Sequence, residues 1–330
     1  MDLESSNQPE KEKKQKWSVG RWSISRLFRW IAFLVLAWWL IKNAHADLSV
    51  NKLITQYSYQ DSRFIDVSGI TAHCRIIGKG APVVLLHDAQ SSLHTWTGWL
   101  DSLRGDYQVI CVDLPGFGLT GPHPRGSYSA FMYVEFLDSL AQKLQLNRFH
   151  LVGNGLGAQI AWQFAAEKPQ KVNKLILMNA PGYEKKEHSW VNLLAATPVV
   201  NRIMWTVTPK SLIRIFLEEI YADDAMVSKS LVQRHHDLLL RPGNRKAFTD
   251  RASVRDNRPP VSELVKKITA PTLIIWGAED ALISPQHAYE FHQQVPRSDL
   301  RIYPNTGHWP QEENPSQTVS DVKAFLEDRF

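Results

Sequence analysis

Cysteine is scarce in this chain: Cys74 and Cys111 are the two present among 330 residues. Two cysteines exclude a small disulfide-stabilised scaffold, and without a Cys-x-x-Cys pair the common thiolate metal and redox sites are excluded as well. Both residues fall in segments with the pattern of neighbouring strands, which favours two small, buried, apolar side chains. A cross-strand disulfide stays open as an alternative, because the folded part is expected in an oxidising compartment.

Cofactor motifs are missing too. The sequence holds no G-x-x-x-x-G-K-[ST] phosphate loop, and its glycine-rich segment 113–118 lacks the context of a dinucleotide site. There is no H-E-x-x-H metal motif, and the adjacent His235 and His236 would point apart on a helix. We therefore expect no cofactor and no metal.

Positive charge is concentrated at the N-terminus. Eight basic and four acidic residues give residues 1–46 a net charge of +4, whereas the whole chain carries +5, which leaves +1 for the other 284 residues. A nucleic-acid-binding body would need a basic surface of its own. The charge distribution points to a membrane and excludes nucleic acid as the expected partner.

The N-terminal segment has the pattern of a membrane-targeting sequence. Residues 1–26 are expected to form a disordered, basic, cytoplasmic arm, and residues 31–41 are an uncharged apolar run. As a helix this run spans about 16 Å, short of a ~30 Å hydrocarbon core unless flanking residues extend it. Residues 27–46 are then either a retained signal anchor, which the flanking tryptophans favour, or a signal peptide cleaved near Ala46. Both place the body outside the cytoplasm, on the periplasmic side of a bacterial inner membrane or secreted.

From residue 60 the chain alternates strand-like and helix-like segments, which predicts an α/β fold with a mostly parallel sheet covered by helices on both faces. The expected strands are 62–67, 70–77, 82–87, 107–114, 149–153, 172–178, 271–277 and 300–304. The expected helices are 128–146, 156–167, 285–295 and 316–330. Residues 60–180 and 263–330 would form this core.

Residues 181–262 interrupt the alternation with amphipathic helical stretches, which predicts an inserted helical cap. Its expected helices are 193–207, 212–221 and 227–240. Its large apolar residues are expected to pack the cap onto the body or to line a pocket for a small apolar ligand; they are Leu193, Leu194, Ile203, Met204, Trp205, Ile213, Ile215 and Phe216. Arg241 or Arg245 could hold an anionic ligand, but salt bridges within the protein are the favoured interpretation.

The segment Gly153-Asn154-Gly155-Leu156-Gly157 lies between an expected strand and an expected helix. It has the context and both flanking glycines of a G-x-S-x-G nucleophile elbow, a sharp turn that presents a nucleophile at the top of the sheet. The central position, where serine is normal, holds Gly155. The side chain that the turn should present is absent.

Over about residues 60–330 the chain resembles the α/β-hydrolase superfamily, and most of all its bacterial, cap-bearing serine hydrolases. These include esterases, lipases, C–C bond hydrolases and dehalogenase relatives. The matching pieces follow successive strands in the expected order: Leu86-His87-Asp88, Asp113-Leu114-Pro115-Gly116, the elbow, Trp276-Gly277-Ala278-Glu279-Asp280 and Gly307-His308-Trp309-Pro310. The resemblance implies an eight-stranded sheet with Asp280 as the triad acid and His308 as the base.

The resemblance also implies an oxyanion hole made by the backbone N–H groups of Leu156 and Ala89. Family members usually carry glycine directly after the histidine at position 87, but here the residue is Asp88. A carboxylate beside the hole would oppose a developing oxyanion unless it turned away or paired. Ser91 and Ser92 lie on the same loop as possible replacement nucleophiles, although neither has the geometry of the elbow.

Without the serine hydroxyl the acyl-enzyme route is closed. Three hypotheses follow. The favoured one is a catalytically impaired homologue that binds a small apolar ligand under the cap. The alternative is an active carboxylic-ester or C–C bond hydrolase, or a lyase, in which His308 and Asp280 activate water. The third is that Gly155 is an engineered or erroneous residue in an ordinary serine hydrolase.

Overall fold

The computed structural model describes residues 21–183, 190–254 and 261–329, which fall into two units that divide after Asn43. Of the predicted disordered arm, residues 1–20 lie outside the described residues, and residues 21–26 belong to the first helix. In the first unit, α1 (Arg21–Lys42) is a 22-residue helix with exposed apolar side chains from Leu27 to Ile41. No helix within the described residues is both long and apolar enough to cross a membrane, so the predicted spanning helix is not found.

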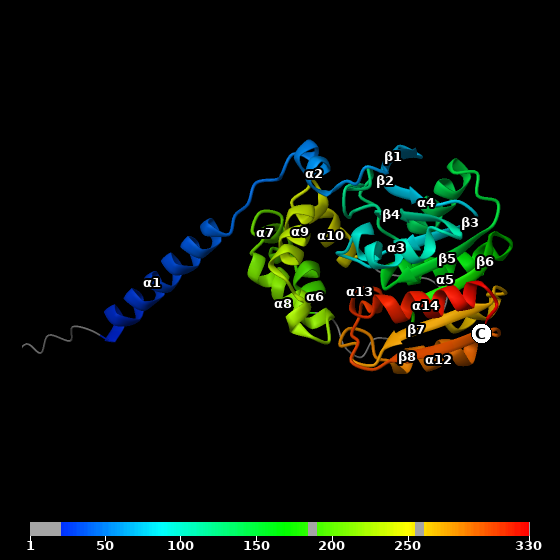
Figure 1. The fold of residues 1–330 in the computed structure, drawn as a ribbon. Helices are drawn as coiled ribbons and strands as arrows, with labels where there is room; N and C mark the ends of the chain where they lie inside the picture. The colour runs from blue at the N-terminus through cyan, green and yellow to red at the C-terminus, as the bar shows by residue number, and fades with distance from the viewer. Residues whose placement is uncertain (1–20, 184–189, 255–260, 330) are drawn as a thin grey trace, which may run out of the picture. The chain divides into compact units, whose positions relative to one another are not determined.

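The second unit is built on one eight-stranded sheet in the order β1-β2-β4-β3-β5-β6-β7-β8 (Figure 1). Strand β2 is antiparallel to β1 and β4, and the remaining neighbours are parallel, which confirms the predicted α/β-hydrolase sheet. A turn at Ser68 and Gly69, both with positive φ, joins the first two strands. The strands are β1 (Ser62–Val67), β2 (Ile70–Ile77), β3 (Ala81–Leu86), β4 (Tyr107–Val112), β5 (Phe149–Asn154), β6 (Val172–Met178), β7 (Thr272–Gly277) and β8 (Ser298–Tyr303).

Helices cover both faces of the sheet, because alternate residues of the buried strands point to opposite sides. One face packs against α4 (Ala130–Lys143), α5 (Leu156–Glu167) and α12 (Gln286–Gln294). The other packs against α3 (Thr97–Leu103) and α14 (Pro315–Leu326). Short helical turns complete the body: η1 (Leu93–Trp96), η2 (Pro169–Lys171), η4 (Val265–Lys267) and α13 (Pro310–Glu313).

The two cysteines lie on adjacent strands but on opposite faces of the sheet. Cys74 is opposite Val112, and Cys111 is opposite Arg75, so the pair is offset by one residue. Successive residues of a strand point to opposite sides, and the two thiols accordingly belong to different hydrophobic clusters. Both are free and buried, and the open alternative of a cross-strand disulfide is wrong.

The described part of the predicted cap contains helices and no strand. They are α6 (Trp190–Ala196), α7 (Val200–Met204), α8 (Lys210–Ile220), η3 (Asp224–Met226), α9 (Lys229–Leu239), α10 (Asn244–Ala252) and α11 (Val261–Leu264). The single helix expected over 193–207 is divided in two at Pro198, which cannot continue an α-helix, and at Val199, whose φ is +71°.

A segment at the start of the second unit holds the cap. Ala44 pairs with Val207, and Arg245 donates to Asp47 at 2.6 Å as well as to the carbonyls of His45 and Thr206. The favoured interpretation of Arg245 as an internal ion pair agrees with this arrangement. Helix α2 (Val50–Tyr57), which the sequence patterns did not indicate, follows this segment and buries Leu53 completely.

Candidate active site

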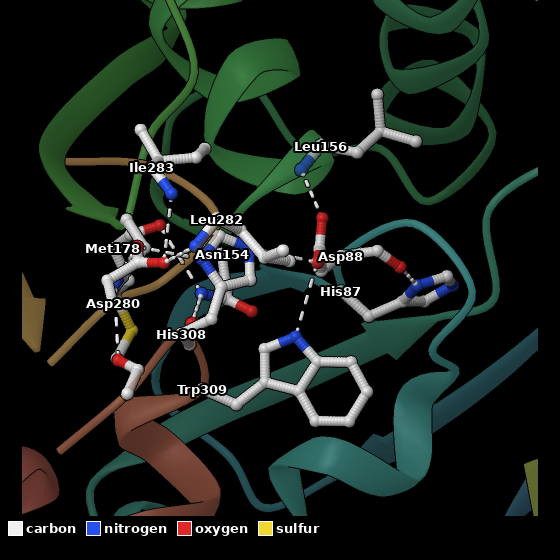
Figure 2. A network of polar contacts seen from close by, with 12 residues as sticks. His87, Asp88, Asn154, Leu156, Met178, Asp280, Leu282, Ile283, His308 and Trp309 are labelled. Atoms are coloured by element: carbon white, nitrogen blue, oxygen red, sulfur yellow. Dashed lines mark hydrogen bonds and ion pairs between the residues drawn. The ribbon is translucent and has the colours of Figure 1, made fainter. Parts of the chain in front are cut away.

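The predicted site residues meet at the carboxyl edge of the sheet. Asp88 follows β3, Gly155 follows β5, Asp280 follows β7, and His308 lies on the loop after β8. Open α/β sheets place their ligand sites at this edge. Figure 2 shows that the Asp88, Asp280 and His308 side chains converge on one buried network, although they lie far apart in sequence.

Gly155 has the backbone of a nucleophile elbow. Its φ of 52° and ψ of −118° form the sharp turn into α5, a conformation that glycine adopts at little steric cost. The flanking glycines are needed for close approach, since a β-carbon on Gly157 would lie 2.1 Å from the carbonyl oxygen of Leu86. The turn therefore has the predicted geometry and carries no side chain at its centre.

The space of the missing side chain is occupied by Asp88. A β-carbon built on Gly155 would lie 1.9 Å from Asp88 Oδ1 and 2.1 Å from its Cγ. No side chain larger than hydrogen fits at position 155 while this carboxylate stays in place. The sequence departs from the pattern that the resemblance implies at positions 88 and 155, and these two positions share one space: the Asp88 side chain lies where a side chain at position 155 would begin.

Both oxygens of the Asp88 carboxylate have hydrogen-bond partners. Oδ1 accepts from the Leu156 N–H at 2.7 Å, which is the predicted oxyanion-hole donor. Oδ2 lies 3.2 Å from His308 Nε2 and accepts from Trp309 Nε1, also at 3.2 Å. Of the two expected arrangements of Asp88, turned away from the site or paired, the structure shows the paired one. Its carboxylate occupies the donor that the resemblance assigns to the oxyanion hole.

On its other side, His308 is held by Asp280. His308 Nδ1 donates to Asp280 Oδ2 at 2.8 Å, and Asn179 Nδ2 donates to the same oxygen at 2.7 Å. Asp280 Oδ1 accepts from the backbone N–H groups of Leu282 and Ile283. The acid and base assigned by resemblance thus lie in hydrogen-bond contact, in the orientation that fixes the imidazole of a triad.

His308 carries a positive charge at neutral pH. Burial alone would lower the pKa of its imidazole, but the carboxylates of Asp280 and Asp88 raise it to about 10. Burial would likewise raise the pKa of the Asp88 carboxyl, but the contacts with His308, Leu156 and Trp309 hold it at about 2. An imidazolium between two carboxylates can donate a proton but cannot accept one, so the site contains no free base in this arrangement.

Trp309 closes the site from the side of the cap. It is fully buried, its ring stacks on His235 at 5.5 Å, and it packs edge-on against Tyr221 at 5.7 Å. Asp88 is 7% and His308 2% exposed. The ion pair is therefore shielded from water, which strengthens its electrostatic attraction.

The loop after β3 places the other predicted residues away from the histidine. The Ala89 N–H, the second expected oxyanion donor, makes no hydrogen bond to any described residue. Ser92 Oγ is bonded to His94 Nδ1 at 2.9 Å, and no described contact links Ser91 to His308. His87 Nε2 accepts from the Leu114 N–H, so its Nδ1 carries the proton and donates to the Asp88 carbonyl at 2.6 Å, which orients this loop.

Sequence reasoning missed the direct pairing of Asp88 with His308. A signal was available, because an acid at a position that is usually glycine coincides with a glycine at a position that is usually serine. The expected apolar packing of the cap is partly wrong: Phe216 is buried, but Leu193, Leu194, Ile203 and Ile215 are exposed. Within the described residues no group of His, Cys, Asp or Glu side chains could hold a metal ion.

Comparison with known proteins identifies the family. The sequence profile described as alpha/beta hydrolase fold matches residues 81–315. An uncharacterised protein of Mycobacterium tuberculosis is 30% identical over 284 residues, which span 80% of this chain and 81% of that protein. The 2-hydroxy-6-oxo-2,4-heptadienoate hydrolase of Pseudomonas putida is 26% identical over 283 residues, covering 83% and 99%.

Solved structures show the same fold. A meta-cleavage product hydrolase from Pseudomonas fluorescens superposes with a TM-score of 0.70 at 23% identity, covering 82% of this chain and 98% of that one. A bacterial membrane phospholipase A gives a TM-score of 0.71 at 21% identity, covering 94% and 99%. With the sheet order, the elbow turn and the matching profile, these findings establish that the chain belongs to the α/β hydrolase fold family.

Proposed function

We propose that this chain is a hydrolase homologue that has lost serine acyl-transfer chemistry and binds a small molecule without cleaving it through an acyl-enzyme. The observation that carries the proposal is the Asp88 carboxylate, which fills the serine position, takes the Leu156 donor and keeps His308 protonated. Each of these three effects removes one requirement of serine hydrolysis: the nucleophile, the oxyanion donor and the base.

The direct attack of water is disfavoured by the same contacts. A water molecule would need His308 as general base, but the imidazolium between Asp88 and Asp280 has no lone pair to offer at neutral pH. Similarity to a relative named as a hydrolase, 2-hydroxy-6-oxo-2,4-heptadienoate hydrolase, supports direct hydrolysis by water as an alternative. The positive charge of His308 argues against it.

Reversing both substitutions tests the proposal. Gly155→Ser alone would overlap Asp88, and Asp88→Gly alone would supply no nucleophile. The double variant Asp88→Gly/Gly155→Ser has both a hydroxyl and a free Leu156 N–H. We expect p-nitrophenyl ester turnover to rise about 100-fold or more above wild type in the double variant and to stay at the wild-type level in each single variant. The proposal would be overturned if the wild-type protein turned over the ester and was also covalently labelled by a fluorophosphonate.

A second candidate function follows from the ionised state of Asp88: a carboxylate nucleophile. Its Oδ2 would attack the sp³ carbon of an alkyl halide, forming a C–O bond as the halide leaves with the electron pair of the C–X bond. Esterification would remove one of the charges that keep His308 protonated, so the imidazolium could release its proton to solvent, which balances the charge of the departing halide. The neutral imidazole would then accept a proton from water as that water attacks Cγ, with the Leu156 N–H stabilising the oxyanion. Collapse of this intermediate would expel the alkoxide, which takes the proton from His308 to leave as the alcohol, and the carboxyl group would give its own proton to His308 and become a carboxylate again.

Isotope labelling separates the two candidates. A carboxylate nucleophile takes one oxygen from water at every turnover. Incubation with 1-bromobutane in H₂¹⁸O should therefore place ¹⁸O in the peptide that contains Asp88, while Asp280 remains unlabelled as an internal control. If neither bromide nor labelled peptide appears, this second candidate fails and the first stands.

We also propose that the protein is held at a membrane with its body outside the cytoplasm. Support comes from the exposed apolar side chains of α1 and its basic residues, and from exposed apolar side chains on the cap. These cap residues, called the cap face below, are Leu193, Leu194, Val199, Ile203, Leu212 and Ile215.

Vesicle binding tests this placement. The full chain should float with phosphatidylglycerol-containing vesicles, and Ile203→Ser/Ile215→Ser should weaken flotation severalfold. Phe131→Ser is the matched control, since Phe131 is 65% exposed but lies on α4 and is not part of the cap face. Equal flotation of the two variants would contradict a role for the cap face. An alkaline phosphatase fused after Phe330 should be active if the body is outside the cytoplasm and inactive otherwise.

A further inference from the structure

A cleft of about 470 Å³ opens where the α2 segment, the cap and the body meet. Its lining includes aromatic and charged side chains from all three parts: Tyr57, Tyr59, His94, Tyr221, Arg234 and Glu312. Asp88, Gly155 and His308 are not among the lining residues. The cleft is linked to them through Tyr221, whose ring contacts Trp309.

Arg234 brings an unpaired positive charge to this cleft. It makes no hydrogen bond or ion pair with the residues that the structure describes, and its Nε–H is buried without a partner. By contrast, Arg245 in the same cap makes bonds to four partners. An unsatisfied charged donor is costly to bury, which indicates a position that an anionic group from outside completes.

Glu312 lines the same cleft and has a carboxylate oxygen without a hydrogen-bond partner among the described residues. Its Oε2 accepts from the Tyr221 hydroxyl at 2.7 Å, while its Oε1 is buried and has no partner. Arg234, Tyr221 and Glu312 all line the cleft. Burial and Glu312 raise the pKa of the Tyr221 hydroxyl, and the charge of Arg234 opposes that rise. The cleft is therefore suited to a molecule that carries both a negative charge, for Arg234, and a hydrogen-bond donor, for Glu312 Oε1.

The rings in the lining have their polar atoms committed elsewhere. The Tyr57 hydroxyl donates to Asp237 at 2.8 Å, and the Tyr59 hydroxyl lies at hydrogen-bond distance, 3.2 Å, from Thr97 Oγ1. His94 bonds to Ser92 Oγ and the Tyr57 carbonyl, and burial lowers its pKa to about 4, so it is neutral at physiological pH. These rings offer apolar surface to a ligand, whereas Arg234 supplies the charge.

We propose that this cleft binds a small aromatic acid with a hydroxyl or amino group next to its carboxylate. The carboxylate pairs with Arg234, the O–H or N–H donates to Glu312 Oε1, and the aromatic body lies against Tyr57 and Tyr59. This inference rests on the proposed function in that it names the class of small molecule bound, and it replaces the expectation of a purely apolar ligand.

Calorimetric titration of the full-length protein tests the proposal with four matched probes: phenyllactate, phenylalanine, 3-phenylpropionate and 2-phenylethanol. We expect phenyllactate or phenylalanine to bind, and the one that binds more tightly tells a hydroxy acid from an amino acid. Removing the donor (3-phenylpropionate) or the carboxylate (2-phenylethanol) should each cost about tenfold in Kd, as a lost hydrogen bond to a charged group does.

The variants locate the site. Arg234→Met should weaken binding at least about tenfold, and Arg125→Gln, at an exposed arginine outside the cleft, should leave it unchanged. Glu312→Gln should reduce the difference between phenyllactate and 3-phenylpropionate. The proposal is overturned if no probe binds with a Kd below ~10 mM, which is about 5.5 kcal/mol weaker than a micromolar ligand, or if Arg234→Met binds the probes as wild type does. Such a result would leave the ester-turnover test of Asp88 and Gly155 untouched, so the two proposals can fail separately.

Discussion

Asp88 Oδ1 lies 1.9 Å from the point where a β-carbon at position 155 would stand, so the carboxylate of one loop and the bare Cα of another share a single space. This relationship predicts non-additive effects on stability. Gly155→Ser should cost about 3 kcal/mol in the wild-type background, because the serine overlaps Asp88 and strains a backbone with φ of 52°. In the Asp88→Gly background the same change should cost about 1 kcal/mol, the backbone strain alone.

A double-mutant cycle by urea denaturation measures the coupling as the difference between these two costs. We expect a coupling of about 2 kcal/mol. Additive effects within ~0.5 kcal/mol would mean that Asp88 moves aside freely and does not occupy the serine position.

The Asp88–His308 ion pair makes stability depend on pH. The folded state lowers the pKa of Asp88 from 3.8 to about 2, so its contribution is present above pH 3.8 and is lost as the pH falls toward 2. The folded state raises the pKa of His308 from 6.5 to about 10, so that contribution is complete below pH 6.5 and is lost as the pH rises through 10.

The unfolding free energy of the wild type should therefore be lower at about pH 9 than at about pH 6. Asp88→Asn keeps the shape of the side chain but removes one of the two charges that stabilise the imidazolium. It should destabilise the protein at pH 6 by roughly 3 kcal/mol, and less at the higher pH. A variant with the pH dependence of wild type would show that Asp88 does not set the charge of His308.

Gly157 is required by the approach of α5 to β3. Its β-carbon would lie 2.1 Å from the Leu86 carbonyl oxygen, which is backbone and cannot rotate away. Gly157→Ala should therefore destabilise the protein by about 3 kcal/mol or prevent folding. Gly105→Ala is the matched control, since nothing lies within 4 Å of its β-carbon, and it should be neutral or slightly stabilising in thermal denaturation.

Both thiols should be found reduced in protein purified without reductant. Cys74 and Cys111 point to opposite faces of the sheet, so oxidation cannot join them without breaking strand pairing. Thiol titration in denaturant should give two free groups per chain. A mass lower by two hydrogens, with a linked peptide pair after digestion, would refute the register of β2 and β4.

The sheet was predictable because its signals are local. Buried strands such as β3 appear as continuous apolar runs, and the glycines at 153 and 157 mark where β5 turns into α5. Asp280 and His308 could be assigned because the family places them after particular strands. These features depend on a few neighbouring residues each.

The role of Asp88 depends on contacts that no local pattern contains. Its partner Leu156 is 68 residues away and its partner Trp309 is 221 residues away. Periodicity also failed in the cap, where an apolar helical face marked Leu193 and Ile215 for burial but the structure leaves both exposed. A period identifies the apolar face of a helix but does not say whether protein covers that face.

The overlap at position 155 also restricts mutational history. If the proposed loss of a serine is right, an Asp88 that arrived before Gly155 would meet an occupied β-carbon, whereas Gly155 could arrive first at little structural cost. The less costly order is then loss of the hydroxyl followed by gain of the acid. A laboratory lineage selected toward esterase activity should accordingly remove the acid before it gains the alcohol.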